Sequence, residues 1–197
     1  MRYIPIIFFI FLFSFTVISC AKKSDSSSSS SASGSPGTYQ LATNDYANGV
    51  ATDSSGNVYV TGGTKGGLDG NTSAGNTDLF VVKYNSSGTK QWTKQLGSSG
   101  RDSANGVATD SSGNVYVTGG TKGGLDGNTN TGASDIFVVK YNSSGTKQWT
   151  KQLGSSSRDY DYGVATDSSR NVYVSGDTYG GLDNNTNAGY NSSGTKQ

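Results

Sequence analysis

The 197-residue chain carries a formal net charge of +1, 29 glycines, one cysteine, no histidine, and acidic residues that are all aspartates. This composition disfavours helices and favours strands joined by tight turns, and a single cysteine excludes an internal disulfide. A nearly neutral charge argues against a surface that binds nucleic acid or anionic membranes.

Residues 1–19 are predicted to be a signal peptide. Arg2 supplies a positive charge, and residues 4–15 are almost wholly apolar but too short to span a membrane. Residues 17–20 (Val-Ile-Ser-Cys) place a small residue directly before the cysteine, and polar residues follow at once. This segment resembles the lipobox of bacterial lipoproteins, which implies cleavage before Cys20 and acylation of its thiol. The alternative is an uncleaved anchor helix with an incidental cysteine.

Residues 20–38 are predicted to be the lipidated cysteine and a serine-rich, disordered tether. Stable attachment to a membrane needs more than one acyl chain, and the lipoprotein family adds several. Ala21 in place of an acidic residue favours the outer membrane or cell surface over the inner membrane. Cleavage also removes Arg2, so that 14 basic residues balance 14 acidic ones.

Residues 39–197 contain an internal repeat with a period of 57 residues. The motif GVATD begins at Gly49, Gly106 and Gly163, and residues 49–72 are identical to residues 106–129. The units are predicted at about residues 39–99, 100–156 and 157–197. A repeat of this length indicates units that bury their apolar faces against their neighbours.

Each complete unit is predicted to contain four short antiparallel strands, in the first unit at residues 49–52, 57–61, 78–84 and 89–96. The third strand is apolar on both faces, and Trp92 and Leu96 share one face of the fourth. The predicted turns combine an Asx side chain with a glycine, so three aspartates are expected to cap turns: Asp53, Asp110 and Asp167. The predicted fold class is all-β, a β-propeller-like array of about 2.5 four-stranded blades.

The stretches GVATDSSGNVYVTGGT and DLFVVKYNSSGTKQWTKQLG resemble the SBBP repeat of bacterial β-propeller proteins. The resemblance covers about residues 49–187 and implies a propeller fold. Separately, Gly88-x-x-x-Trp92 and Gly145-x-x-x-Trp149 are similar to the tryptophan-docking signature of quinoprotein-type propellers. That similarity implies that each indole packs between adjacent blades. The quinone-binding residues of those propellers have no counterparts here, so no organic cofactor is expected.

The third unit lacks the residues equivalent to 133–140, which include the apolar strand of the second unit. Propeller rings typically have about four to eight blades, and an open array exposes strand edges and apolar faces. Three explanations stay open: a truncated product of a longer repeat gene, closure through a homo-oligomer, and a stable open stack. Residues 38–42 resemble the end of a fourth strand and are predicted to pair with the last sheet.

Nucleophilic catalysis needs a serine, cysteine or lysine beside a base, and this sequence offers only aspartate as the base. The turn aspartates have a structural explanation. Asp102 and Asp159 follow arginines and are interpreted as paired surface charges. We therefore expect no enzymatic activity.

Calcium is the one metal that the sequence suggests, because hard oxygen ligands recur at alternate positions in the long loops. The candidate ligands are Asp69, Asn71 and Asp78 in the first unit and Asp126, Asn128, Asn130 and Asp135 in the second. The match to a calcium loop is partial. The glycine of the second unit's loop, Gly132, lies one position later than in an EF-type loop, and the chain has no glutamate to act as a bidentate ligand. The alternative is a polar connecting loop.

The expected function is that of a lipid-anchored, non-catalytic module that binds a protein or glycan ligand or scaffolds an envelope assembly. Its rivals are a truncated remnant without independent function and a calcium-stabilised adhesion module. Propeller ligands usually contact the loops at one end of the ring. These loops are predicted to carry only Gly, Asn, Thr and Asp, so the sequence does not identify the ligand.

Overall fold

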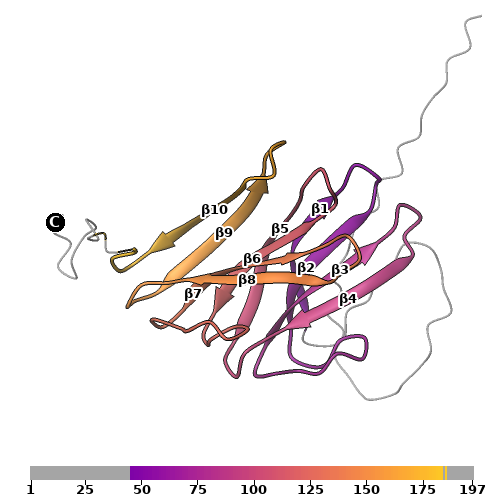
Figure 1. Cartoon of the computed structure of the whole chain (residues 1–197). Coiled ribbons are helices and arrows are strands. Elements are labelled where there is room, and N and C mark those ends of the chain that lie inside the picture. The colour runs from indigo at the N-terminus through magenta and orange to yellow at the C-terminus, as the bar shows by residue number, and fades with distance from the viewer. Residues whose placement is uncertain (1–44, 184, 186–197) are drawn as a thin grey trace, which may run out of the picture. The chain divides into compact units, whose positions relative to one another are not determined.

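The computed structural model describes residues 45–183 and residue 185, and every regular element in this part of the chain is a β-strand (Figure 1). No helix long and apolar enough to cross a membrane occurs among these residues. Cys20, the serine-rich tether, residues 38–42 and residues 186–197 lie outside the described residues.

Ten strands form three antiparallel sheets in which consecutive strands are neighbours. The first sheet contains β1 (Tyr46–Thr52), β2 (Val58–Thr64), β3 (Asp78–Tyr84) and β4 (Lys90–Leu96). The second contains β5 (Asp102–Thr109), β6 (Val115–Thr121), β7 (Asp135–Tyr141) and β8 (Lys147–Leu153). In the described residues the third contains β9 (Asp159–Thr166) and β10 (Val172–Thr178). The predicted all-β, propeller-like array of four-stranded sheets is confirmed.

The first two strands of each unit are longer than the sequence pattern predicted. β1 begins at Tyr46 and contains a bulge between Ala47 and Gly49, and β2 continues through Gly62 and Gly63. A Cβ atom at Gly62 would lie 1.8 Å from the Tyr46 carbonyl oxygen, so this close approach requires glycine. Glycine and asparagine are depleted in strands, and for this reason the pattern missed both extensions.

Consecutive sheets pack face to face and share a core. β1 lies beside β5, and β5 lies beside β9. The first sheet contributes the fully buried side chains Tyr59, Leu79 and Val81. The second sheet contributes Val115, Val117, Phe137, Val139 and Tyr141. Burial of one such side chain contributes about 1.5–3 kcal/mol, so this junction is a major source of stability.

Trp92 on β4 anchors the first sheet to the second. Its indole lies between Tyr59 of its own sheet and Tyr141 of the next, with ring centroids 6.0 and 6.4 Å away. Its Nε1 donates a hydrogen bond to the Ser143 carbonyl oxygen in the β7–β8 turn at 3.3 Å. Gly145 in that turn has a φ of 79°, and a Cβ atom there would lie 2.9 Å from the indole. The turn and the docked ring therefore both require glycine.

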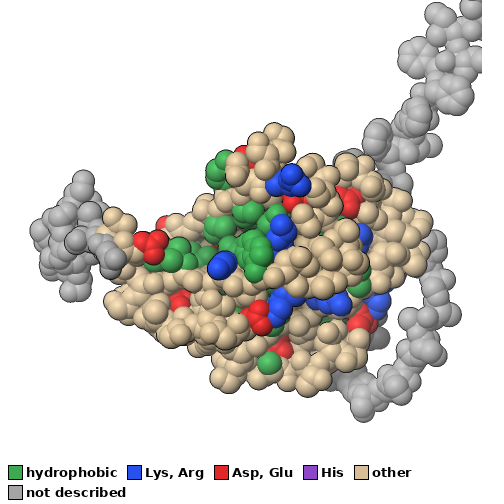
Figure 2. Space-filling view, in the orientation of Figure 1, with side chains coloured by type: hydrophobic (Ala, Val, Ile, Leu, Met, Phe, Trp, Pro, Cys, Tyr) green, Lys and Arg blue, Asp and Glu red, His purple; other side chains and the backbone are tan. Residues whose placement is uncertain are grey.

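Trp149 occupies the equivalent position on β8 and packs on Tyr116 of its own sheet at 6.1 Å between centroids. The counterpart of the turn that receives Trp92, residues 190–194, lies outside the described residues. Leu153 on the same strand is 42% exposed. Figure 2 shows apolar side chains gathered over the area between β8 and β9 of Figure 1. Among the described residues, the junction between the second and third sheets therefore leaves more apolar surface exposed than the first junction does.

Trp92→Ala and Trp149→Ala are matched variants, because residues 80–99 and 137–156 are identical. Loss of Trp92 removes packing from two sheets and is expected to lower the free energy of unfolding by about 3 kcal/mol. Among the described residues Trp149 packs on its own sheet, so the contact seen there accounts for a loss of about 1–2 kcal/mol. Urea unfolding followed by circular dichroism measures both values. A loss of only about 1 kcal/mol in Trp92→Ala would contradict its role as the anchor between sheets.

Candidate functional site

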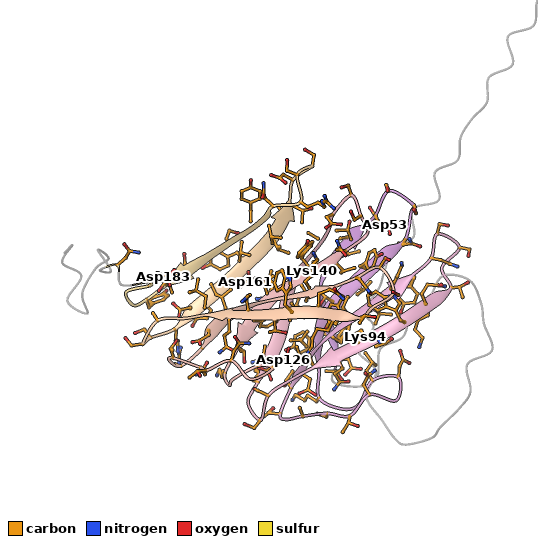
Figure 3. All side chains as sticks on the ribbon, viewed as in Figure 1. Asp53, Lys94, Asp126, Lys140, Asp161 and Asp183 are labelled. Atoms are coloured by element: carbon orange, nitrogen blue, oxygen red, sulfur yellow. The ribbon has the colours of Figure 1, made fainter. Side chains whose placement is uncertain are left out.

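The two ends of the sheets carry different kinds of connection (Figure 3). The turn end holds the tight β1–β2 and β3–β4 turns and their counterparts. The cleft end is the end at which β1, β5 and β9 begin and β2, β6 and β10 finish, and it holds the long loops. Figure 3 labels Asp53 at the turn end and Asp126 and Asp183 toward the cleft end.

Asp53 closes the β1–β2 turn with both carboxylate oxygens. Oδ1 accepts hydrogen bonds from the backbone N–H groups of Ser55 and Asn57 at 2.9 and 3.0 Å. Oδ2 accepts from Asn57 Nδ2 at 2.7 Å and from the Tyr59 hydroxyl at 2.9 Å. Burial disfavours the charge, but these hydrogen bonds outweigh burial and lower the pKa of Asp53. The equivalent aspartates also cap their turns: Asp110 and Asp167.

Asp102 and Asp159 are fully buried, so the interpretation of them as paired surface charges is wrong. Asp102 accepts hydrogen bonds from the Ser98 backbone N–H at 2.6 Å, from the Ser98 hydroxyl at 2.9 Å and from the Thr121 hydroxyl. Asp159 accepts the same pair of hydrogen bonds from Ser155. Donors of this kind make a buried carboxylate tolerable, and here they hold the chain where it passes from one sheet to the next.

Two predicted calcium ligands, Asp69 and Asp126, contact the fourth strand of their own sheets. Asp69 forms an ion pair with Lys90 at 2.5 Å and accepts a hydrogen bond from the Thr93 hydroxyl at 2.5 Å. On β8, Lys147 and Thr150 make the same contacts with Asp126. They lower the pKa of Asp126, chiefly through the Lys147 ammonium. Both carboxylates are therefore occupied by the protein's own donors.

The other predicted calcium ligands lie in the same loops. The amide groups of Asn71 and Asn128 donate to loop carbonyl oxygens. Asp78 and Asp135 each accept hydrogen bonds through Oδ2, whereas their Oδ1 atoms and Oδ1 of Asn130 are buried without a hydrogen-bond partner. Among residues 45–183, no three carboxylate side chains come together in a way that could hold a metal ion. Calcium binding stays a prediction.

Two open clefts lie at the cleft end, where the first and second sheets meet. Their volumes are about 400 Å³ for the first cleft and about 300 Å³ for the second, and both are lined by Tyr46 and Arg101. The first cleft is also lined by Asp45, Lys65, Asn76 and Thr77. The second is also lined by Asn48, Ser103, Asn105, Gly120, Lys122 and Ser134. Hydroxyl, amide and cationic groups dominate this lining, which suits a polar ligand.

Lys65, Arg101 and Lys122 give the clefts a positive charge. All three are exposed, and the ion pairs found among the described residues lie on β4 and β8 instead. Arg101 Nη2 donates to the Tyr46 hydroxyl at 3.2 Å, and that hydroxyl donates to Ser103 Oγ at 3.1 Å. This chain of hydrogen bonds places the guanidinium between the two sheets. Three cations and one lining carboxylate favour an anionic ligand.

The model of the SBBP family, described as a beta-propeller repeat, matches residues 40–69, 91–126 and 148–183, which together make up more than half of the chain. The chain belongs to the SBBP β-propeller repeat family. The second match covers most of β4 and all of β5 and β6. An SBBP repeat therefore crosses the junction between two sheets and contains both Trp92 and the cleft-end residues that follow it.

The SBBP array is also similar to parts of two curated proteins. The Uncharacterized WD repeat-containing protein L264 of Acanthamoeba polyphaga mimivirus is 30% identical over 132 residues, which are 58% of this chain and 9% of that protein. The Regulatory protein FlaEY of Caulobacter vibrioides is 28% identical over 139 residues, which are 64% of this chain and 15% of that protein. The chain thus spans only a small part of the length of either relative.

The residues that line the clefts were not predicted from the sequence, because only small and polar side chains were expected in the loops at that end. The missed set includes Tyr46, Lys65, Arg101 and Lys122. Differences between the SBBP units are the signal that could have found part of this set. Tyr46, for example, corresponds to Ser103 in the second unit, although residues 49–72 and 106–129 are identical.

Asp161 places a carboxyl group between the second and third sheets of the SBBP array, where the second unit has Ala104 (Figure 3). The residue is 4% exposed, and its Oδ2 has no hydrogen-bond partner. Its Oδ1 lies 2.9 Å from Thr118 Oγ1, which also lies 2.8 Å from the Phe137 carbonyl oxygen. One hydroxyl hydrogen cannot serve two acceptors. Burial raises the pKa of Asp161 and outweighs the hydrogen bonds from Thr118, Asn105 and the Gly163 backbone, which lower it.

Asp161→Ala is expected to stabilise the SBBP array more at neutral than at acidic pH. Because the folded-state pKa is raised, the carboxyl's contribution to the free energy of unfolding is fully present below its ordinary pKa of 3.8. That contribution is lost as the pH rises through the folded-state pKa, so removal of the carboxyl becomes more favourable. Thermal unfolding midpoints of both proteins measure this effect. The advantage of the variant should grow by about 2–4 °C between about pH 4 and pH 7. A difference that does not change with pH would contradict the assignment.

Proposed function

We propose that this chain is the SBBP-repeat part of an exported, lipid-anchored, non-catalytic protein that binds an acidic glycan at its cleft end. The observation that carries the proposal is the pair of open clefts lined by three unpaired cations and one carboxylate. The whole chain has a net charge of only +1. Attraction of an anion would therefore come from the clefts and not from a general positive field.

A carboxylated sugar fits both kinds of group in the clefts. The guanidinium of Arg101 can donate two parallel hydrogen bonds to a carboxylate, and the lysines add charge. The side chains of Ser103, Asn105 and Ser134 supply hydroxyl and amide groups that suit sugar hydroxyls. Because both clefts are open and adjoin at Tyr46 and Arg101, they would accept a polymer as well as a single sugar.

A binding role agrees with the chemistry that the chain carries. The sequence has no histidine, so acid–base catalysis at neutral pH would have to rest on carboxylates or lysines. Asp53, Asp102 and Asp159 are held by turn and loop donors. The two similar proteins are named as a WD repeat-containing protein and a regulatory protein, and neither name states an enzymatic activity.

Polygalacturonate and its fully methyl-esterified form are matched probes for this proposal, since esterification replaces each charged carboxylate with a neutral methyl ester and leaves the sugar rings unchanged. The full chain is expected to bind the charged polymer more tightly. The double variant Arg101→Ala/Lys122→Ala should lose about tenfold or more in affinity for the charged polymer and little for the ester. Isothermal titration calorimetry measures both affinities.

Arg170→Gly is the matched control, because it removes a positive charge at the turn end and introduces the residue found at Gly113. It should bind both polymers as the unaltered chain does. Equal affinity of the unaltered chain for the two polymers would overturn the proposal. A loss in Arg170→Gly as large as that in the cleft variant would do the same.

Residues 1–20 support the lipid anchor. An apolar stretch at residues 4–15 precedes Cys20, and residues 21–38 are rich in serine. An acylated cysteine followed by a flexible segment would hold the repeat array near a membrane without a spanning helix.

Cys20→Ser is expected to abolish incorporation of labelled palmitate and to move the protein from the membrane fraction to the soluble fraction. The thiol is the acyl acceptor in this proposal, and the serine hydroxyl preserves size but not that chemistry. Ser24→Ala, a change within the tether, is the control and should leave labelling intact. Labelling of the Cys20→Ser chain at the level of the unaltered chain would exclude the anchor.

A further inference from the structure

The third unit differs from the second at seven positions when residues 158–183 are compared with residues 101–126. They are Tyr160, Asp161, Tyr162, Arg170, Ser175, Asp177 and Tyr179. Six of them lie in the cleft-end halves of β9 and β10 or directly after β10. Four of the six correspond to residues that all line the second cleft: Ser103, Asn105, Gly120 and Lys122. Substitution is therefore concentrated where the preceding sheet forms its cleft.

The tyrosine cluster, defined as Tyr160, Tyr162, Asp177 and Tyr179, lies on one face of the third sheet at the cleft end. Tyr160 pairs with Asp177 across the two strands, and alternate residues of a strand share a face. The rings of Tyr160 and Tyr179 meet edge to face, with centroids 5.9 Å apart and an interplanar angle of 77°. The Tyr162 hydroxyl donates a hydrogen bond to Asp177, which raises the pKa of Tyr162.

Within the part of the chain that the structure describes, the cluster is open to solvent, and its chemistry differs from that of the two clefts. The three tyrosines are 40%, 63% and 65% exposed in chain order. Asp177 and Tyr179 replace the glycine and lysine of the second sheet, so positive charge gives way to aromatic surface and a carboxylate. Arg158 lies at the edge, with Nη1 3.5 Å from the Tyr160 hydroxyl. Exposed rings with polar tips beside a carboxylate suit a ligand that has both C–H faces and hydroxyl groups.

We propose that the tyrosine cluster is a second subsite that stacks a pyranose ring of the acidic glycan bound by the clefts. The C–H face of a sugar packs on exposed tyrosine rings, and Asp177 accepts hydrogen bonds from ring hydroxyls. Because Asp177 would repel a carboxylate, the charged groups of the polymer lie at Arg101 and the lysines. This inference rests on the proposed function, since it assigns a further subsite to the same ligand.

The double variant Tyr160→Ser/Tyr162→Asn tests the subsite, because it introduces the residues that the second sheet carries at Ser103 and Asn105. Its affinity for polygalacturonate should fall about fivefold to tenfold. The ratio between the affinities for charged and esterified polymer should stay unchanged, because stacking does not depend on the carboxylate. Tyr162→Phe keeps the ring and should bind within about twofold of the unaltered chain. Calorimetry on the full chain measures each value.

Failure of the subsite is distinguishable from failure of the proposed function. If the unaltered chain binds neither polymer, both proposals are overturned. If the chain binds and Arg101→Ala/Lys122→Ala weakens binding while Tyr160→Ser/Tyr162→Asn does not, only the subsite is overturned. Sedimentation velocity of the unaltered chain and of Tyr160→Ser/Tyr162→Asn, both without polymer, compares their oligomeric states. A change in oligomeric state with unchanged affinity would assign the cluster to contact with a second copy of the chain and overturn the subsite.

Discussion

A unit of four short strands has two apolar faces and cannot bury both alone, so the rest of this structure depends on the packing of each sheet against the next. At the junction of the first two sheets, Tyr59 and Val81 meet Phe137 and its neighbours in one buried core. Trp92 extends that contact to the β7–β8 turn of the second sheet. The core-facing residues recur from unit to unit under this constraint, because one unit must present the face that the preceding unit can cover.

The same constraint separates the two ends of the array. At the turn end, Asp53 and its counterparts use their carboxylates to close turns, and their hydrogen bonds recur from unit to unit. At the cleft end the strands begin with residues that differ between units, such as Tyr46, Ser103 and Tyr160. Side chains on a fixed scaffold can change there without loss of the core, and binding residues commonly occupy such positions. The clefts and the tyrosine cluster follow this division.

Much of the fold was predictable from the sequence, and the reasons are local. The strand at residues 78–84 was predicted with its observed bounds, because it is a continuous apolar run between turn signals. The first two strands were predicted too short, because a bulge and two glycines interrupt the alternating pattern. The burial of Asp102 could not be predicted, since its partners Ser98 and Thr121 meet it only after the sheets have formed. The clefts escaped prediction because each is assembled from separate strand ends and loops.

The claim that the ligand contacts the cleft end and not the turn end can be tested by nuclear magnetic resonance. Amide shifts of the full chain, labelled with nitrogen-15, would be followed during titration with oligogalacturonate. The largest changes should fall on the first residues of β1, β5 and β9 and on the loops that contain Lys65 and Lys122. Amides in the turns closed by Asp53 and Asp110 should stay in place. Changes centred on those turns, or spread evenly over both ends, would contradict a binding site at the clefts.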